Sequence, residues 1–448
     1  MVFATPGNPQ ALLNDARALL SAGRLDEAAQ RLQMASMSAP TNPAISMNLG
    51  IVELKRRHFD KAAEAFGRAA KTEPGNAQAW MFLAEAKQGA ADHSGALEAL
   101  DRALSLRPTE GAIVARRAEV LALLGKDAEA ADAYRILVKA APKEPGFWHN
   151  LGNVLMRLED FAGARDAFGR ADALKPDDAA ILYGLGRAHL FDQDYEAALP
   201  QLAAALERAP HKLQIISYKI ICLRHLGRNE EADALEGLND LVVGLEIEAP
   251  KGFSSVDAFN QALSEEILNH SRLTEVGRHR ATRNGAKLDN MFDVEPSPLF
   301  QAFEVQVRNG FDRALAAMPN KQGHPLPLSP PDGYRFLNMW SNVMHRGGHQ
   351  APHNHPSGWF SACYYNLMPQ AVETSGDDQE GWIEFGGVAY DLPGVEDAPV
   401  RRIKPEPGML VVFPSYIFHR TIPFESDEIR ISCACDARPG AWPNSVNG

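Results

Sequence analysis

Proline recurs through the N-terminal half of this 448-residue chain at a fixed spacing of 34 residues. The phased positions are Pro40, Pro74, Pro108, Pro142, Pro176 and Pro210. Proline cannot continue the hydrogen-bond ladder of a helix, so each of these residues is expected to follow the end of a helix. A period of this length predicts a solenoid in which each unit buries its apolar face against the next.

Between the prolines, small and large residues alternate in a fixed frame. Gly152 and Ala164 allow two antiparallel helices to approach closely, while larger side chains fill the space beside them. This frame resembles the tetratricopeptide repeat. The resemblance implies seven units over residues 7–244, with degenerate first and last units as caps, and a binding surface for a partner protein or peptide.

Composition excludes several partners. The formal net charge is −12, which gives the whole chain no electrostatic footprint for nucleic acid. No apolar run approaches the roughly 18 residues of a membrane span, and the first residues carry no signal pattern. The four cysteines lack the spacing of a zinc or redox motif. We therefore expect a soluble cytoplasmic protein that binds neither nucleic acid nor membrane.

The residue pattern of the sequence changes after residue 244. Residues 245–330 are predicted as a helical linker and flanking helices, with amphipathic candidates at 255–270 and 298–318 and a polar, turn-rich segment at 278–292. Residues 331–440 contain short aromatic and β-branched runs separated by proline and glycine. This spacing predicts a β-sandwich or barrel and not a parallel sheet.

A local concentration of histidines lies in this β-rich region. His353 and His355 flank one asparagine, so in an extended chain both imidazoles lie on one face and can reach one metal ion. His419, which follows the apolar run 408–418, is the candidate third ligand from another strand. Arg430 and Ser432 share one face of a further strand.

These motifs together resemble the jelly-roll (double-stranded β-helix) oxygenases that use Fe(II), 2-oxoglutarate and O2, in particular the prolyl and aspartyl/asparaginyl hydroxylase relatives. The resemblance covers roughly residues 270–440. It implies that Arg430, with Ser432, binds the distal carboxylate of 2-oxoglutarate, and that Tyr365 lies near the same carboxylate. The implied activity is hydroxylation of a substrate C–H bond.

One position departs from the pattern of that family, because most relatives carry a carboxylate where this chain has His355. Three arrangements are open. His355 is the third ligand, or it lies outside the ligand set and the metal keeps two histidines, or Glu384 supplies a carboxylate. Of the nearby histidines, His349 is expected beside the ligands or at the surface, and His345 has no expected role.

Two other functions are compatible with the sequence. One is a non-catalytic repeat scaffold with a degenerate metal-binding jelly roll. The other is a three-histidine metalloenzyme that does not use 2-oxoglutarate. Arg430 favours the oxygenase, since a co-substrate carboxylate explains a buried cation there. The substrate is expected to be a protein or peptide side chain recruited by the repeats, and the alternative is a small molecule that enters the jelly roll directly. The predicted groove residues are His149, Asn153, Arg157, Tyr183, Arg187 and Arg224.

Overall fold

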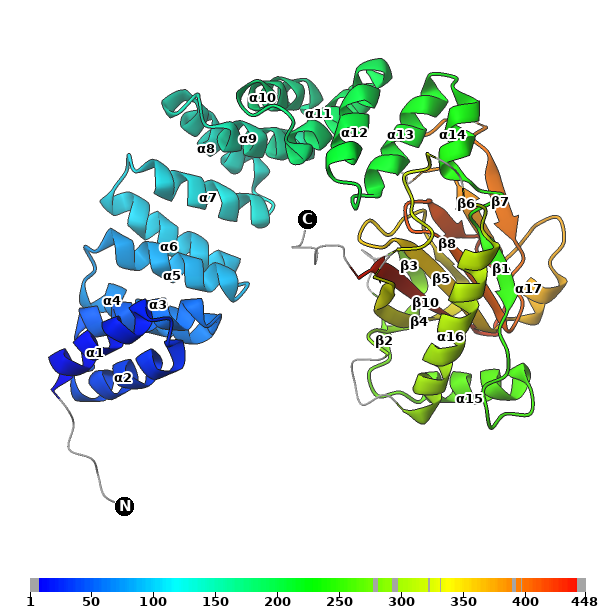
Figure 1. Cartoon of the computed structure of the whole chain (residues 1–448), viewed down its shortest axis with the longest axis horizontal. Helices are drawn as coiled ribbons and strands as arrows, with labels where there is room; N and C mark the ends of the chain where they lie inside the picture. The colour runs from blue at the N-terminus through cyan, green and yellow to red at the C-terminus, as the bar shows by residue number, and fades with distance from the viewer. Residues whose placement is uncertain are drawn as a thin grey trace. The chain divides into compact units, whose positions relative to one another are not determined.

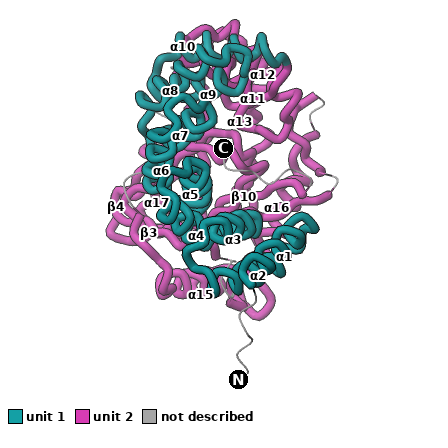
Figure 2. The backbone as a smooth tube through the Cα atoms, turned by 90° about the vertical axis from the view of Figure 1, so that its left-hand side faces the viewer, with its two compact units in different colours: residues 1–176 teal, residues 177–448 magenta. Residues whose placement is uncertain are grey.

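The computed structural model describes residues 8–276, 281–291, 297–320, 323–330, 332–388, 392–395 and 397–440. The chain divides into two compact units, residues 1–176 and 177–448, which are teal and magenta in Figure 2. Within the described residues, no helix combines the length and the apolarity that a bilayer crossing needs.

The first unit consists of helices that follow one another as packed pairs (Figure 1). The pairs match the 34-residue period, with one pair for each predicted repeat. Their bounds are α1 Pro9–Ser21 and α2 Leu25–Ser38, α3 Pro43–Lys55 and α4 Phe59–Thr72, α5 Ala77–Gly89 and α6 His93–Leu106, α7 Gly111–Leu123 and α8 Asp127–Ala140, and α9 Pro145–Arg157 and α10 Phe161–Leu174.

Close packing within a pair follows from the residues that the sequence singled out. A Cβ atom added at Gly152 of α9 would lie 2.8 Å from the ring of Phe168 on α10, so only glycine permits this approach. The indole nitrogen of Trp148 donates to the carbonyl oxygen of Pro142 at 2.9 Å. The phased proline therefore ends one helix and also anchors the next.

The second unit begins with two further helix pairs and continues into the β-rich region. The helices are α11 Ala179–Phe191, α12 Tyr195–Arg208, α13 Gln214–His225 and α14 Asn229–Glu236. Helix α14 stops where Gly237 adopts a left-handed conformation with a φ of 62°, which a glycine accepts without strain.

Two antiparallel sheets form the predicted β-sandwich. The larger sheet has the strand order β1-β8-β5-β10-β4-β3-β2, and the smaller has the order β7-β6-β9. Phe385 of the smaller sheet contacts Phe413 of the larger one, with 4.8 Å between ring centroids. The strands are β1 Val243–Glu246, β2 Thr274–Glu275, β3 Thr282–Leu288, β4 Tyr334–Gln350, β5 Phe360–Leu367, β6 Ile383–Gly386, β7 Val400–Ile403, β8 Met409–Pro414, β9 His419–Thr421 and β10 Arg430–Pro439.

The segment 245–330 is only partly helical. It contains the two expected helices, α15 Val256–Leu268 and α16 Pro298–Ala317, and the short helix α17 Gln370–Thr374 lies later in the chain. Strand β3 was not expected, because 278–292 was predicted as a turn-rich segment. The limit predicted between residues 244 and 245 falls inside β1, which pairs with β8. The three domain ranges remain predictions.

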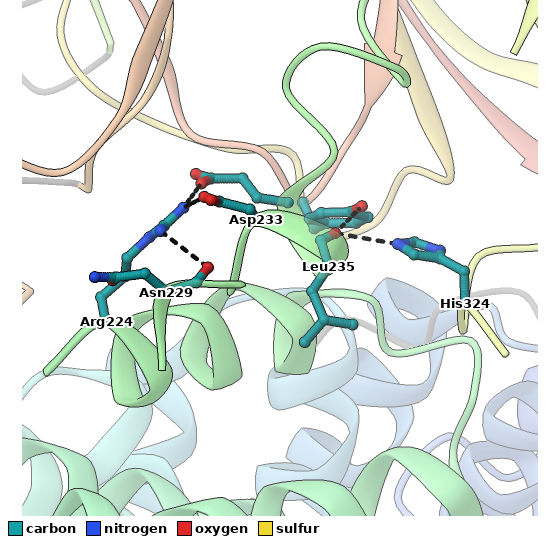
Figure 3. A network of polar contacts seen from close by, with 7 residues as sticks. Arg224, Asn229, Asp233, Leu235 and His324 are labelled. Atoms are coloured by element: carbon teal, nitrogen blue, oxygen red, sulfur yellow. Dashed lines mark hydrogen bonds and ion pairs between the residues drawn. The ribbon is translucent and has the colours of Figure 1, made fainter. Parts of the chain in front are cut away.

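Helices α13 and α14 share one hydrophobic core with the β-sandwich. The hydroxyl of Ser217 on α13 donates to the carbonyl oxygen of Tyr416 at 2.8 Å. The hydroxyl of Tyr416 in turn donates to the carbonyl oxygen of Leu235, which also accepts from His324, as Figure 3 shows for the latter contact. The last helix pair is therefore built into the fold that carries the histidines.

Candidate metal centre

Three histidines meet at the open end of the sandwich. His353 and His355 lie in the segment between β4 and β5, and His419 begins β9. One nitrogen from each imidazole lies within 4.8 Å of the others, and this is the cluster of possible metal ligands that the described residues contain. The backbones of His353 and His419 exchange two hydrogen bonds, of 3.1 and 2.9 Å, so their spacing is fixed by the main chain.

The Nδ1 atom of each histidine already has a hydrogen-bond partner. His353 Nδ1 lies 2.8 Å from the carbonyl oxygen of Ala351, and His419 Nδ1 lies 3.2 Å from that of Ile417. A carbonyl oxygen only accepts, so each Nδ1 carries the proton and each Nε2 keeps its lone pair. Metal-binding histidines typically use the second ring nitrogen in this way.

Burial keeps two of these imidazoles neutral. Burial is the largest cause that lowers the pKa of His353, to about 4, and the neighbouring His355 lowers it further. The pKa of His419 lies well below its usual value for the same reason, with His353 and His355 adding to the effect. Neutral imidazole is the form that binds a metal, so these ligands need lose no proton at pH 7.

A pocket of about 350 Å³ opens onto this cluster. Trp340 stacks on His355, with ring centroids 5.7 Å apart and planes inclined by 17°, and the Lys287 ammonium lies 4.8 Å from the centre of the Trp340 ring. Both Trp340 and Asn338 line the pocket. The full lining is Ala281, Thr282, Lys287, Asn338, Trp340, Gln350, His353, Asn354, His355, Pro356, Ser357 and Asp436.

The strand register brings the predicted co-substrate residues onto one face of the larger sheet. Ser432 on β10 lies opposite Tyr365 on β5, and Asp436 lies opposite Ser361. Directly opposed residues share a face, and so do alternate residues along a strand. Arg430, Ser432 and Asp436 therefore occupy the same face of β10, which also carries Tyr365 from β5.

Arg430 is a buried cation without a carboxylate partner among the described residues. Its exposed fraction is 1%, and one guanidinium nitrogen donates to the carbonyl oxygen of Gly381 at 2.8 Å. The guanidinium lies 5.4 Å from the centre of the Tyr365 ring. Within the described part of the chain, Arg430 Nε and the Tyr365 hydroxyl are both buried without a hydrogen-bond partner. Unpaired buried polar groups are costly, so this arrangement fits an anionic, hydrogen-bonding ligand such as 2-oxoglutarate.

Glu384 does not join the histidines. On β6 it lies next to Phe385, which pairs with His419, so its side chain points to the opposite face. Arg402 and Arg420 each donate to its carboxylate at 2.6 Å. Burial alone would raise the pKa of Glu384, but these two arginines lower it. Glu384 is therefore an ion-paired residue outside the metal cluster.

The two nearby histidines, His349 and His345, lie outside the cluster, as expected. His349 Nδ1 contacts the carbonyl oxygen of Gly347 at 3.0 Å. The side chain of His345 is half exposed, and its nearest carboxylate, that of Glu275, lies 4.0 Å away.

Sequence reasoning missed Asp436 and Ser217. Asp436 carboxylate oxygens lie 2.8 and 3.0 Å from His355 Nδ1. The alternation along β10 from Arg430 to Asp436 was the signal that could have found this residue. Ser217 accepts a hydrogen bond of 3.2 Å from the side-chain amide of Asn354. No local pattern reveals that contact, because the two residues are 137 positions apart in the chain.

The predicted groove residues of the first unit contact other residues of the helices α8 and α9. His149 and Asn153 contact each other on α9, with 3.4 Å between their closest side-chain nitrogens. Arg157 forms an ion pair of 2.7 Å with Asp127 of α8. The side chain of Arg157 remains about half exposed.

In the second unit the prediction for Arg224 is wrong. Its exposed fraction is 7%, and it donates to Asp233 and Glu236 at 2.6 and 2.8 Å and to the carbonyl oxygen of Asn229. Figure 3 shows this guanidinium turned toward α14. The repeat offset places a solvated residue there, but in this short final pair it links α13 to α14.

Tyr183 and Arg187 do form a cluster within the second unit. The Arg187 guanidinium lies over the rings of Tyr183 and Tyr218, 5.5 and 6.0 Å from their centres. Lys212 adds a second cation 5.8 Å from the centre of the Tyr183 ring. Arg187 Nε is buried and finds no hydrogen-bond partner in the segments that the structure describes.

Two families match the chain. Residues 47–87, 83–145, 149–212 and 185–238 match the family described as "Tetratricopeptide repeat". Residues 338–436 match the family described as "Putative 2OG-Fe(II) oxygenase". The second match begins at the pocket residue Asn338 and ends at Asp436, and it includes the three histidines and Arg430.

Several solved structures are similar to the repeat region. MamA from Desulfovibrio magneticus RS-1 is 20% identical over 37% of this chain and 94% of its own, with a TM-score of 0.36. The C-terminal part of a TPR repeat-containing protein from Cytophaga hutchinsonii is 15% identical over 50% of this chain and 92% of its own, with a TM-score of 0.43. YrrB, described as a TPR protein with an unusual peptide-binding site, is 16% identical over 41% of this chain and 94% of its own, with a TM-score of 0.36.

The comparison with curated proteins found no match. The two family matches lie in separate parts of the sequence and agree with the helix pairs and with the β-sandwich. The N-terminal part of the chain thus matches the tetratricopeptide repeat family, and the C-terminal part matches the family described as "Putative 2OG-Fe(II) oxygenase".

Proposed function

We propose that this protein is an Fe(II)- and 2-oxoglutarate-dependent oxygenase that hydroxylates a C–H bond of a protein or peptide side chain. The observation that carries the proposal is the combination of two features in the second unit. Three imidazole nitrogens lie within 4.8 Å of one another. A buried arginine, which has no carboxylate partner among the described residues, shares one face of β10 with Asp436, and Asp436 contacts His355.

His353, His355 and His419 are the proposed ligands of the iron. Their Nδ1 atoms are held by acceptors, which leaves three Nε2 lone pairs for one ion. Imidazole suits Fe(II), and three protein ligands leave coordination positions open for the co-substrates. The bound iron supplies the oxidative chemistry, and the protein supplies ligands, orientation and exclusion of water.

Arg430, Ser432 and Tyr365 are the proposed partners of 2-oxoglutarate. The guanidinium offers donors in a fixed geometry that matches a carboxylate, and its Nε has no hydrogen-bond acceptor among the described residues. Burial raises the pKa of the Tyr365 phenol well above its usual value, so the hydroxyl keeps its proton and can donate it in a hydrogen bond. Both groups would gain a partner when the carboxylate binds.

The proposal of a protein or peptide substrate rests on the repeats. Tetratricopeptide repeats generally bind proteins, and Tyr183 and Arg187 present aromatic and cationic groups on helix α11. Arg187 and Lys212 have no ion-pair partner among the described residues, although the whole chain is acidic. An acidic or polar segment of a substrate complements this cluster.

The direct test is turnover by the purified full chain. Incubated with Fe(II), ascorbate and 2-oxoglutarate, it should release succinate, and a 2-oxoglutarate-dependent mass gain of one oxygen should appear on a protein of the host lysate. His419→Ala should abolish the succinate signal, because it removes a ligand. Stoichiometric iron binding without binding or turnover of 2-oxoglutarate would instead favour a three-histidine metalloenzyme of another kind.

A further inference from the structure

The carboxylate of Asp436 lies against the histidine that replaces the usual acidic ligand. Its two oxygens are 2.8 and 3.0 Å from His355 Nδ1. The other two histidines of the cluster use neutral carbonyl oxygens at the same ring position. His355 is thus distinguished from His353 and His419 by the charge of its partner.

Several contacts hold Asp436 and His355 in this arrangement. The Ser361 hydroxyl donates to an Asp436 oxygen at 2.7 Å, and the same hydroxyl lies 2.8 Å from that of Ser415. The backbone N–H of His355 donates to the Ser415 carbonyl oxygen at 2.9 Å. On the other side, the Trp340 ring stacks on the imidazole. Residues of β5, of the segment after β8 and of the pocket wall therefore hold the Asp436–His355 pair in place.

Asp436 has no lysine or arginine partner among the described residues, and its carboxylate accepts hydrogen bonds from His355 and Ser361. Its side chain is mostly buried, with an exposed fraction of 16%. A buried carboxylate requires a balancing positive charge or strong hydrogen bonds. A dication held by the three histidines would supply that charge through the imidazole of His355.

Formal charge supports the same conclusion. A divalent ion held by two imidazoles and one carboxylate has a single net positive charge. Held by three neutral imidazoles alone, it keeps two net positive charges. Counting Asp436 as part of the site restores the balance of the usual two-histidine, one-carboxylate set. A carboxylate that accepts from a ligating histidine also increases the electron donation of that ligand.

We propose that Asp436, acting through the Nδ1–H of His355, supplies the negative charge that a carboxylate ligand supplies in related oxygenases. Asp436 is a positioning residue, since it touches the ligand and not the metal. The proposal rests on the proposed function in that the three histidines must hold a metal. It adds that one of them is tuned by a charge outside the ligand set.

The test measures the affinity of the full chain for Co(II) alone, by competition with a chelating dye, in a double-mutant cycle. Asp436→Asn preserves shape and removes the charge, and we expect it to weaken Co(II) binding roughly 10- to 100-fold. In a His355→Asp background the same substitution should change the affinity much less, because the Nδ1–H contact is gone. Asp427→Asn, which removes an exposed charge paired with Arg346, should have no effect.

An equal loss in both backgrounds would show a general charge effect and overturn the proposal, as would unchanged affinity in Asp436→Asn. If the native chain binds no Co(II), the proposed function itself fails, and this inference fails with it.

A second measurement uses the native chain and needs no variant. In the Zn(II)-loaded native chain, the Nδ1–H proton of His355 should resonate further downfield than those of His353 and His419, because its acceptor is charged. Equal shifts would contradict the assignment.

Discussion

Ser217 on helix α13 accepts a hydrogen bond of 3.2 Å from the side-chain amide of Asn354, the residue between two of the clustered histidines. The same serine donates to the carbonyl oxygen of Tyr416 at 2.8 Å. A helix of the last repeat pair thus holds the loop that carries the candidate ligands. The repeat region and the candidate metal centre are joined by a buried polar contact as well as by a shared core.

Ser217→Ala should reduce both stability and metal affinity. It removes the hydroxyl that donates to the buried Tyr416 carbonyl and accepts from the Asn354 amide, so these two groups keep only their direct contact of 3.4 Å with each other. We expect a cost of about 1–3 kcal/mol in the free energy of unfolding. Urea unfolding and Co(II) titration measure the two effects. Ser264→Ala is the matched control, because Ser264 is also buried and hydrogen-bonded but contacts Asn366 and the backbone of α15. That variant should lose stability alone, and unchanged Co(II) affinity in Ser217→Ala would count against the coupling.

Two truncations should behave differently. A fragment that starts at residue 177 keeps the whole second unit and should fold and bind Co(II). A fragment that starts at residue 245 lacks α13 and α14, whose buried residues form one core with the sandwich, and should be insoluble or unfolded. Thermal melting and Co(II) binding distinguish them. A folded, metal-binding fragment 245–448 would show that the last helix pair is dispensable.

Arg430→Gln should weaken binding of 2-oxoglutarate by about 30-fold or more. Removing one partner of a buried charge pair typically costs about 2–5 kcal/mol, and about 1.4 kcal/mol corresponds to a tenfold change. Calorimetric titration of the Co(II)-loaded protein measures this, and Co(II) binding itself should persist because Arg430 is not a ligand. Arg401→Gln is the control, since Arg401 donates to the carbonyl oxygens of Leu238 and Val242 instead. Undiminished affinity in Arg430→Gln would refute the assignment.

Gly152→Ala and Gly169→Ala should change stability in opposite directions. An added Cβ at Gly152 lies 2.8 Å from the Phe168 ring, and overpacking of this kind costs about 1–3 kcal/mol. At Gly169, also within a helix, the added Cβ meets nothing within 4 Å. Alanine there should stabilise the helix by roughly 0.5–1 kcal/mol. Urea unfolding of both variants tests the packing of α9 against α10.

The sequence was most informative where a single physical constraint repeats. Each phased proline follows a helix end, so the helix pairs were predictable one by one. The three histidines were found because strand alternation places His353 and His355 on one side and an apolar run leads into His419. The shared face of Arg430 and Ser432 followed from the same alternation and agrees with the register of β10.

Features that depend on tertiary pairing were not predictable. Strand β3 reads TRNGAKL, which lacks a hydrophobic alternation, and it is a strand because β4 pairs with it. Arg224 was misplaced because the repeat offsets assume a solvated position, while Asp233 and Glu236 draw it into the contact between α13 and α14. The contact of Asp436 with His355 depends on the position of a loop that no local pattern encodes.

The backbone bridge between His353 and His419 reduces the conformational entropy that the ligands would lose when a metal binds. Two of the three histidines are already joined through main-chain hydrogen bonds, and the ring of one of them, His419, packs against Phe413. Little conformational entropy then remains to be lost on coordination, unlike in small metal-folded domains where the ion organises the chain. The centre is preorganised, so a chelator should remove the metal while the β-sandwich stays folded.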